Sequence, residues 1–357
     1  MSCEKRRLWT VFVPLVLLLS IAHLSMAGGQ PNKRRTSEAV APTPTGSADG
    51  APHPIFVLNS LEADVSVIDP QTFKEIKRIA TGKEPHHLYL TPDDKSMVVA
   101  NALSDSLTFL DPASANIQRV VQGITDPYQL RFSPDMKWFV TAGNRLDHVA
   151  LYRWRPEDAA QPFELVRRIP APRTPSHLNI DSKSTVVYAS LQDSDELMAI
   201  DLATQVPRWK IPVGKTPADV FLTPDDKILL LALTGDRYVE AYDVSGAAPR
   251  LIKRIATGSG AHSFRALGDH RHVLVSNRAA NSISVIDTLN LAVDLTFPAP
   301  GGPDDMEVLP DGRTLLVTSR WARKLTLIDL RTHQVVKQVT VGKSPHGVWT
   351  LDHVPRL

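Results

Sequence analysis

Cysteine is almost absent from this sequence. The one cysteine, Cys3, lies before an apolar run from Leu8 to Leu24, which follows three basic residues and precedes the small residue Ala27. This order predicts a secretory signal peptide over residues 1–27, with an uncleaved membrane anchor as the alternative. A chain cleaved after Ala27 has no thiol for a disulfide, a metal-ligating thiolate, c-type haem attachment or an iron–sulfur cluster. We therefore expect a periplasmic or secreted protein without stable membrane insertion after signal cleavage.

An excess of either charge is also missing. The full chain has 40 basic and 38 acidic residues, and removal of residues 1–27 brings the two into balance. Nucleic-acid binding depends on neutralising phosphates with basic residues, so no nucleic-acid partner is expected. Residues 28–52 are rich in Gly, Pro, Ser, Thr and Ala without apolar periodicity, which predicts a disordered linker.

The usual catalytic motifs are absent too. The sequence contains no G-x-S-x-G elbow, no P-loop and no H-E-x-x-H helix. These absences exclude the most recognisable hydrolase, nucleotide-binding and zinc-protease classes.

A repeat of just over forty residues occupies the rest of the chain. Each copy has a turn residue, then four short apolar runs separated by polar turns such as Pro92–Asp94. This period and strand number are typical of propeller blades. The turn residues are Pro85, Pro127, Pro175, Pro217, Gly260, Pro303 and Pro345, at intervals of 42 to 48 residues.

The two ends of the repeat region are complementary. Before Pro85 the chain supplies three strand-like runs between Ile55 and Ile79, and after Pro345 it supplies one, Gly347 to Leu351. We predict that this last run completes the first blade and removes the exposed sheet edges. The fold prediction is an all-β, seven-bladed β-propeller over residues 53–352, with four-stranded antiparallel blades and a ring closed by the C-terminal strand.

Two of these repeats carry a family resemblance. The segments Ser282–Asp287 (SISVID) and Val341–Gly347 (VGKSPHG) resemble the YVTN-type β-propeller repeats of secreted and periplasmic bacterial proteins. The resemblance covers residues 54–351, although the tyrosine of the motif is mostly replaced by Val or Leu. It implies the propeller fold but leaves function open, because lactonases, lyases and cytochrome d1-type domains have similar repeats.

Polar residues gather where the innermost strands should begin. In a propeller these strands line the central channel, which is the usual ligand site. Neutral imidazoles and carboxylates converging there would suit zinc or copper, whereas the alternative is that they satisfy backbone groups around a water-filled channel. The candidate metal ligands are His86 or His87, His177, His262 and His346, converging with Asp219, Asp304 or Asp305. The candidate ligand-binding residues at the strand entries are Gln129, Asp219 and Asp305.

A second polar set follows the second strands of the blades. Guanidinium groups there would suit a carboxylate or phosphate ligand, or they could simply pair with neighbouring aspartates. The members of this set are Arg145, Arg237, Arg278, Arg320 and Trp321. By contrast, the aspartates that end the third strands are expected to cap turns.

The sequence thus supports two functional hypotheses. The first is a non-catalytic periplasmic propeller that binds a small ligand, a metal ion or a protein partner on its channel face. The second is an enzyme, either a metal-assisted lactonase or lyase or a redox protein using copper or a d1-type haem.

Overall fold

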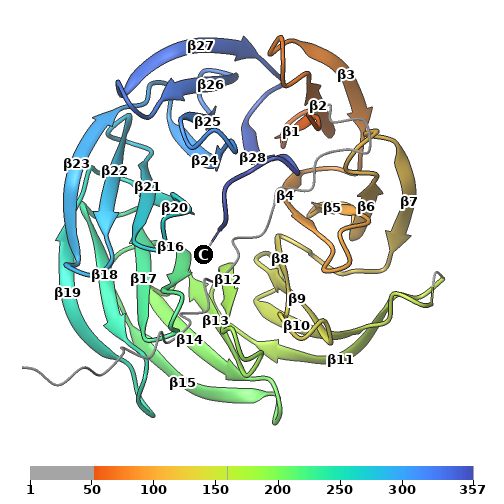
Figure 1. Ribbon diagram of the computed structural model, residues 1–357. Coiled ribbons are helices and arrows are strands. Elements are labelled where there is room, and N and C mark those ends of the chain that lie inside the picture. Colours follow the sequence, from red (N-terminus) through yellow and green to blue (C-terminus); the bar gives the residue numbers. More distant parts are fainter. Residues whose placement is uncertain (1–51, 159, 357) are drawn as a thin grey trace, which may run out of the picture. The chain divides into compact units, whose positions relative to one another are not determined.

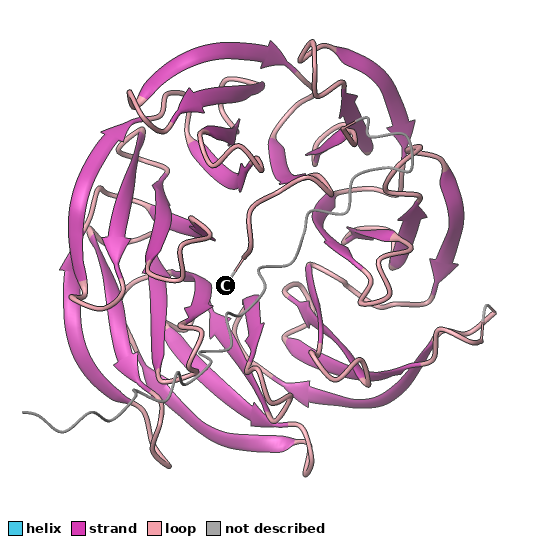
Figure 2. Cartoon of the chain, viewed as in Figure 1, coloured by secondary structure: helices cyan, strands magenta, loops and turns pink. Residues whose placement is uncertain are grey.

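The computed structural model describes residues 52–158 and 160–356, so the predicted signal peptide and the predicted linker up to residue 51 lie outside the described residues. In the described part of the chain every regular element is a β-strand (Figure 2). The strands form seven four-stranded antiparallel sheets arranged as blades around a central channel (Figure 1). The predicted seven-bladed β-propeller is therefore confirmed. Within these residues there is no helix long and apolar enough to span a membrane.

The blades follow one another in sequence, each running from an inner to an outer strand. Blade 1 consists of β28 (Pro345–Trp349), β1 (Ile55–Asn59), β2 (Asp64–Ile68) and β3 (Glu75–Ala80). Blade 2 consists of β4 (Pro85–Leu90), β5 (Met97–Asn101), β6 (Ser106–Leu110) and β7 (Ile117–Gln122). Blade 3 consists of β8 (Gln129–Phe132), β9 (Trp138–Gly143), β10 (His148–Trp154) and β11 (Phe163–Pro170). Blade 4 consists of β12 (Pro175–Ile180), β13 (Val186–Leu191), β14 (Glu196–Asp201) and β15 (Val206–Pro212).

The remaining blades repeat this plan. Blade 5 consists of β16 (Pro217–Leu222), β17 (Ile228–Leu233), β18 (Tyr238–Asp243) and β19 (Arg250–Ala256). Blade 6 consists of β20 (Ala261–Ala266), β21 (His272–Asn277), β22 (Ser282–Asp287) and β23 (Ala292–Pro298). Blade 7 consists of β24 (Pro303–Val308), β25 (Thr314–Ser319), β26 (Lys324–Asp329) and β27 (Gln334–Thr340).

The hydrophobic core lies between adjacent blades. Middle strands such as β5 are buried at every residue, whereas the outer strand β27 is buried only at Val339. Phe56 and Leu58 of blade 1 pack in one cluster with Val99 and Leu110 of blade 2. Because a middle strand has a neighbouring blade on both faces, it needs apolar residues at successive positions, which explains its nearly continuous apolar sequence.

The C-terminal strand closes the ring as predicted. β28 pairs antiparallel with β1, with Phe56 opposite Trp349 and Val57 opposite Val348. The predicted bounds were wrong by two residues, because this strand begins at Pro345 and ends at Trp349. Pairing begins directly at the turn proline in the same way as in blade 2, where Pro85 is opposite Asn101.

The chain after β28 turns toward the middle of the ring, where Figure 1 marks its end. Val354 N donates to Val308 O at 3.0 Å, and Arg265 donates to Val354 O at 2.8 Å. Arg356 pairs with Glu307, a fully buried carboxylate that also pairs with Arg265 at 2.6 Å. Packing against the propeller thus continues to Arg356, past the residue 352 at which the domain was expected to end.

The aspartates that end the third strands cap turns, as expected. Asp69 Oδ1 accepts hydrogen bonds from the backbone N and the hydroxyl of Thr72, at 2.6 and 2.8 Å. Asp111 makes the equivalent contacts with Ser114. These carboxylates therefore belong to the scaffold rather than to a site.

Candidate functional site

The start of each inner strand directs side chains into the channel at two consecutive positions. In blade 2, Pro85 is opposite Asn101 but Leu88 is opposite Val99, so three steps of β4 face two steps of β5. This is a β-bulge, and a bulge lets neighbouring residues point to the same side of a strand. The same irregularity recurs at the start of β12, β16, β20 and β24. The bulges explain how adjacent polar residues such as His86 and His87 both reach the channel.

One expected alignment was wrong. Ala261 pairs with Asn277 in the way that Pro85 pairs with Asn101, so blade 6 begins at Ala261 and not at Gly260. His262 is therefore equivalent to His86 rather than to His87. The upper level of the channel consists of His86, Tyr128, Ser176, Ala218, His262, Asp304 and His346; the next level consists of His87, Gln129, His177, Asp219, Ser263, Asp305 and Gly347.

Four of the predicted histidines form a closed ring around the channel. The centroid distances are 5.1 Å from His87 to His177, 5.2 Å from His177 to His262, 5.7 Å from His262 to His346 and 4.8 Å from His346 to His87. Each pair meets edge to face, at interplanar angles of 69° to 88°. The fold thus brings together side chains that lie up to 259 residues apart in the sequence.

His86 packs against this ring through His346 and His87. Its imidazole lies 3.9 Å from that of His346 and 3.9 Å from the ring of Tyr128, measured between centroids. One nitrogen each from His86, His87 and His346 lies within 4.8 Å of the other two, and all three side chains are buried. Three imidazoles at this separation can close around one metal ion with small rotations.

All five histidines are poised in the neutral form. Burial lowers the pKa of each, and neighbouring cationic or imidazole groups lower it further for most of them. For His262, burial and the adjacent Arg278 lower the pKa to about 3. Neutral imidazole is the form that coordinates a metal, so no proton has to leave before an ion binds.

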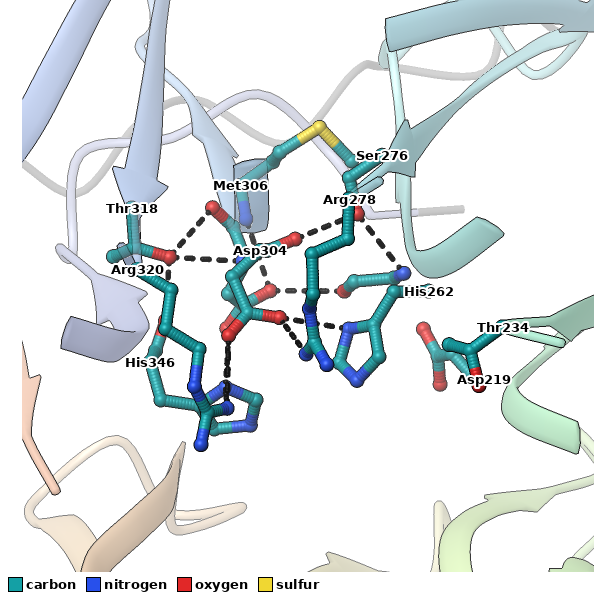
Figure 3. Close-up of polar contacts among 12 residues, drawn as sticks. Asp219, Thr234, His262, Ser276, Arg278, Asp304, Met306, Thr318, Arg320 and His346 are labelled. Carbon is teal, nitrogen blue, oxygen red and sulfur yellow. Dashed lines mark hydrogen bonds and ion pairs between the residues drawn. The ribbon is translucent and has the colours of Figure 1, made fainter. Parts of the chain in front are cut away.

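Asp304 is the only fully buried carboxylate at this level of the channel among the described residues (Figure 3). Its Oδ2 lies 2.7 Å from His346 Nδ1 and 3.1 Å from Arg320, and its Oδ1 lies 2.9 Å from His262 Nδ1 and also contacts Arg278. Burial alone would raise the pKa of Asp304, but Arg278 and the two histidines outweigh burial and hold it well below its usual range. Asp304 is therefore an ionised acceptor.

These contacts define which imidazole nitrogens are free. Because the ionised carboxylate of Asp304 can only accept, His346 Nδ1 carries the hydrogen and donates to it, which leaves His346 Nε2 with a free lone pair. That Nε2 is buried and has no hydrogen-bond partner within the described residues. His87 Nδ1 lies 2.9 Å from Tyr128 O, so its Nε2 is free as well. Imidazoles that donate one N–H to a carboxylate or a carbonyl and present the other nitrogen are typical of metal-binding histidines.

Gln129, Asp219 and Asp305 lie one level below the upper histidines, where each spans the boundary between two blades. Burial raises the pKa of Asp219, and it raises the pKa of Asp305 to about 7. Each side chain accepts a backbone N–H from the next inner strand: Gln129 from Leu178, Asp219 from Phe264 at 2.9 Å, and Asp305 from Val348 at 3.4 Å. Their oxygens are thus engaged in joining blades, and their predicted role in ligand binding stays a prediction.

The predicted arginine set does not act as one ring. Arg278 and Arg320 turn inward to Asp304, as Figure 3 shows. Arg145 is held by Asp126, which it contacts at 3.0 Å. Arg237 and Trp321 are exposed, Trp321 to 60%. An anion site made by all of these side chains is therefore not assembled in this arrangement.

A cavity of about 360 Å³ extends from the histidines along the channel. His87, His177, His262 and His346 line one end of it. Arg131, which sequence reasoning did not select, lies in its wall beside Tyr89. The signal that could have identified Arg131 is strand alternation, since it lies two residues after Gln129 and therefore on the same side of β8. This volume falls in the range of small-molecule sites.

The fold and the site together define a seven-bladed β-propeller with a histidine-lined channel. The chain belongs to the YNCE-like beta-propeller family, whose model matches residues 16–356. A comparison with curated proteins finds no match.

Solved structures share the fold at low sequence identity. The periplasmic gluconolactonase PpgL of Pseudomonas aeruginosa is similar with a TM-score of 0.71 and 18% identity, covering 85% of this chain and 99% of that one. A functionally unknown protein of Desulfotomaculum acetoxidans gives a TM-score of 0.71 at 14% identity, covering 83% and 98%. The dihydro-heme d1 dehydrogenase NirN gives 0.58 at 17% identity, covering 87% and 79%. Identities this low indicate a common fold and not a common activity.

Proposed function

We propose that this protein binds a transition-metal ion of the zinc or copper class at the entrance of its central channel, through His86, His87 and His346. The observation that carries the proposal is the buried Nε2 of His346, which has no hydrogen-bond partner in the described part of the chain while Asp304 holds the opposite ring nitrogen. A buried polar atom without a partner destabilises the fold, and a bound metal ion would be the missing partner of this nitrogen.

The three imidazole nitrogens favour a metal ion of intermediate softness, such as zinc or copper. Neutral imidazole nitrogen suits zinc and copper, whereas magnesium and calcium prefer oxygen ligands. Asp304 supplies the outer hydrogen bond, and Arg278 and Arg320 in turn fix Asp304. The adjoining cavity leaves a place for a further small ligand. The function that we propose is therefore binding, in the periplasm or outside the cell, consistent with the signal-like N-terminal sequence.

Metal content tests this proposal directly. Protein purified without a histidine tag or chelator should contain, or take up on dialysis, about one equivalent of zinc or copper. The double variant His87→Asn/His346→Asn should retain less than about a tenth of an equivalent, because a site with one remaining imidazole cannot hold the ion. Circular dichroism of both proteins shows whether the fold is intact.

A matched control is His270→Asn. His270 is exposed in a turn at a φ of 59°, a conformation that asparagine readily adopts. This variant should bind metal as the wild type does. Wild-type protein that contains no metal and takes up neither zinc nor copper would overturn the proposed function.

A further inference from the structure

Below the histidines, the inner strands present a third level of side chains to the channel. Along a strand, side chains two residues apart lie on the same face and about 7 Å apart. Arg131 follows Gln129 by two residues, and Tyr89 follows His87 in the same way. Both line the cavity that begins at the histidines. The cavity therefore connects the proposed metal site with this third level, which lies about 7 Å deeper than His87 and Gln129.

The guanidinium group of Arg131 is held in position, but not all of its N–H groups are used in hydrogen bonds. Its Nε donates to Leu178 O at 2.9 Å, and its guanidinium lies 4.1 Å from the centre of the Tyr89 ring. These two contacts orient the planar group, which also saves part of the entropy that binding would otherwise cost. Among the described residues no acceptor is hydrogen-bonded to its terminal Nη atoms. An oriented guanidinium with free N–H groups in a cavity is suited to a carboxylate.

Arg265, at the corresponding position of blade 6, shows the contrasting case. It lies in the same cavity wall, but it is 4% exposed and donates to Glu307, Ala266 O and Val354 O. Its hydrogen-bonding capacity is used within the protein. Arg131 is thus the arginine of this level that remains available to a ligand.

The carboxylates on the cavity wall are turned to the backbone. Asp219 accepts from Val220 N and Phe264 N, both at 2.9 Å, so each of its oxygens has a donor. Asp305 accepts from Met306 N at 2.9 Å and from the Ser263 hydroxyl at 3.1 Å. These contacts hold both groups against the wall, and within the described residues neither carboxylate is hydrogen-bonded to Arg131.

We propose that the cavity binds a small dicarboxylate, with one carboxylate on the metal ion held by the histidines and the other on Arg131. This inference rests on the proposed metal site. The spacing of about 7 Å between the two levels selects a short chain of about four carbons. A monocarboxylate of the same length can satisfy only one end of the site.

Succinate and butyrate are the probes, titrated calorimetrically into the zinc-loaded protein. Succinate should bind the wild type at least about tenfold more tightly than butyrate does. Arg131→Gln should weaken succinate binding by about 10- to 100-fold, because a charge-assisted bidentate contact is lost, and should leave zinc stoichiometry and butyrate binding unchanged. Arg131→Lys keeps the positive charge but not the planar pair of N–H donors, so it should weaken succinate binding by an intermediate amount. This variant replaces Arg131→Gln in the test if the glutamine variant does not fold.

The control is Arg250→Gln on the outer strand β19, whose side chain is 70% exposed and pairs with Asp243. It should bind succinate as the wild type does. If zinc binds but succinate binds equally to wild type and Arg131→Gln, the dicarboxylate site is refuted and the metal site stands. If succinate binds with equal affinity to metal-free protein, the two-ended mode is refuted. Protein that binds neither zinc nor copper refutes the proposed function itself.

Discussion

Replacing Asp304 by asparagine should destabilise the propeller more than any exposed ion-pair substitution. The substitution keeps the size of the side chain and removes its charge. Two guanidinium groups and two imidazoles then lose the buried carboxylate that they surround. Removing one partner of a buried ion pair typically costs about 3–5 kcal/mol.

The structure places this variant near the lower limit of that range. Asp304 is fully buried, but the side chains of Arg278 and Arg320 are 21% and 26% exposed, so both cations regain some hydration. We expect a loss of about 3 kcal/mol in the free energy of unfolding. At roughly 2 °C per kcal/mol for a domain of this size, the melting temperature should fall by about 6 °C. Metal affinity should fall by about 10- to 100-fold, because His346 loses its charged hydrogen-bond partner.

Denaturant titration and thermal melting of wild type, Asp304→Asn and Glu164→Gln measure the effect. Glu164 pairs with Arg155 on the surface, where both side chains are about half exposed, so its loss should cost less than about 1 kcal/mol. If Asp304→Asn is no more destabilising than this control, the buried carboxylate does not organise the site in the way argued above.

Two further predictions concern acid and ring closure. The pKa of His262 falls from about 6.5 in the unfolded chain to about 3 in the folded protein. Between these pH values only the unfolded chain binds the proton. The free energy of unfolding should therefore fall by about 1.4 kcal/mol per pH unit as pH drops from 6.5 toward 3. Asp305, whose pKa is raised to about 7, has the opposite effect on stability in this pH range. The test is therefore to compare wild type with His262→Asn by the slope of the free energy of unfolding against pH. Equal slopes would contradict the prediction. Deleting residues 344–357 removes β28 and exposes the edge of β1, and it should cause aggregation or a large loss of stability. A truncated protein that elutes as a monomer and melts at the wild-type temperature would disprove the closure.

The sequence determined the architecture because the blade repeat is local. Within blades 2 to 7 each strand and capping aspartate lies within about forty residues of its partners, so the spacing of the turns predicted the blades. The closing strand is the exception, since β28 pairs with β1 at the other end of the chain, and it was predicted because the two ends of the repeat region supply one strand and three strands. The predicted bounds of that strand and the predicted start of blade 6 were wrong, because hydrogen bonds to the neighbouring strand decide where pairing begins: at the turn proline itself in β28, and one residue after Gly260 in blade 6. The equivalence of Ala261 and Pro85 is visible only in the pairing.

For the candidate site, the sequence determined less and the tertiary structure determined more. The sequence identified the five histidines as channel residues, but spacing within blades says nothing about distances across the channel. Only the closed ring brings His346 to within 4 Å of His86, measured between ring centroids, and only the structure shows that Asp304 rather than Asp219 or Asp305 is surrounded by cations and imidazoles. Burial, which sets the pKa of every one of these groups, arises from neighbours on other blades. The sequence thus determined which residues reach the channel, and the tertiary structure decided which of them meet, since contacts across the channel form between segments far apart in the chain.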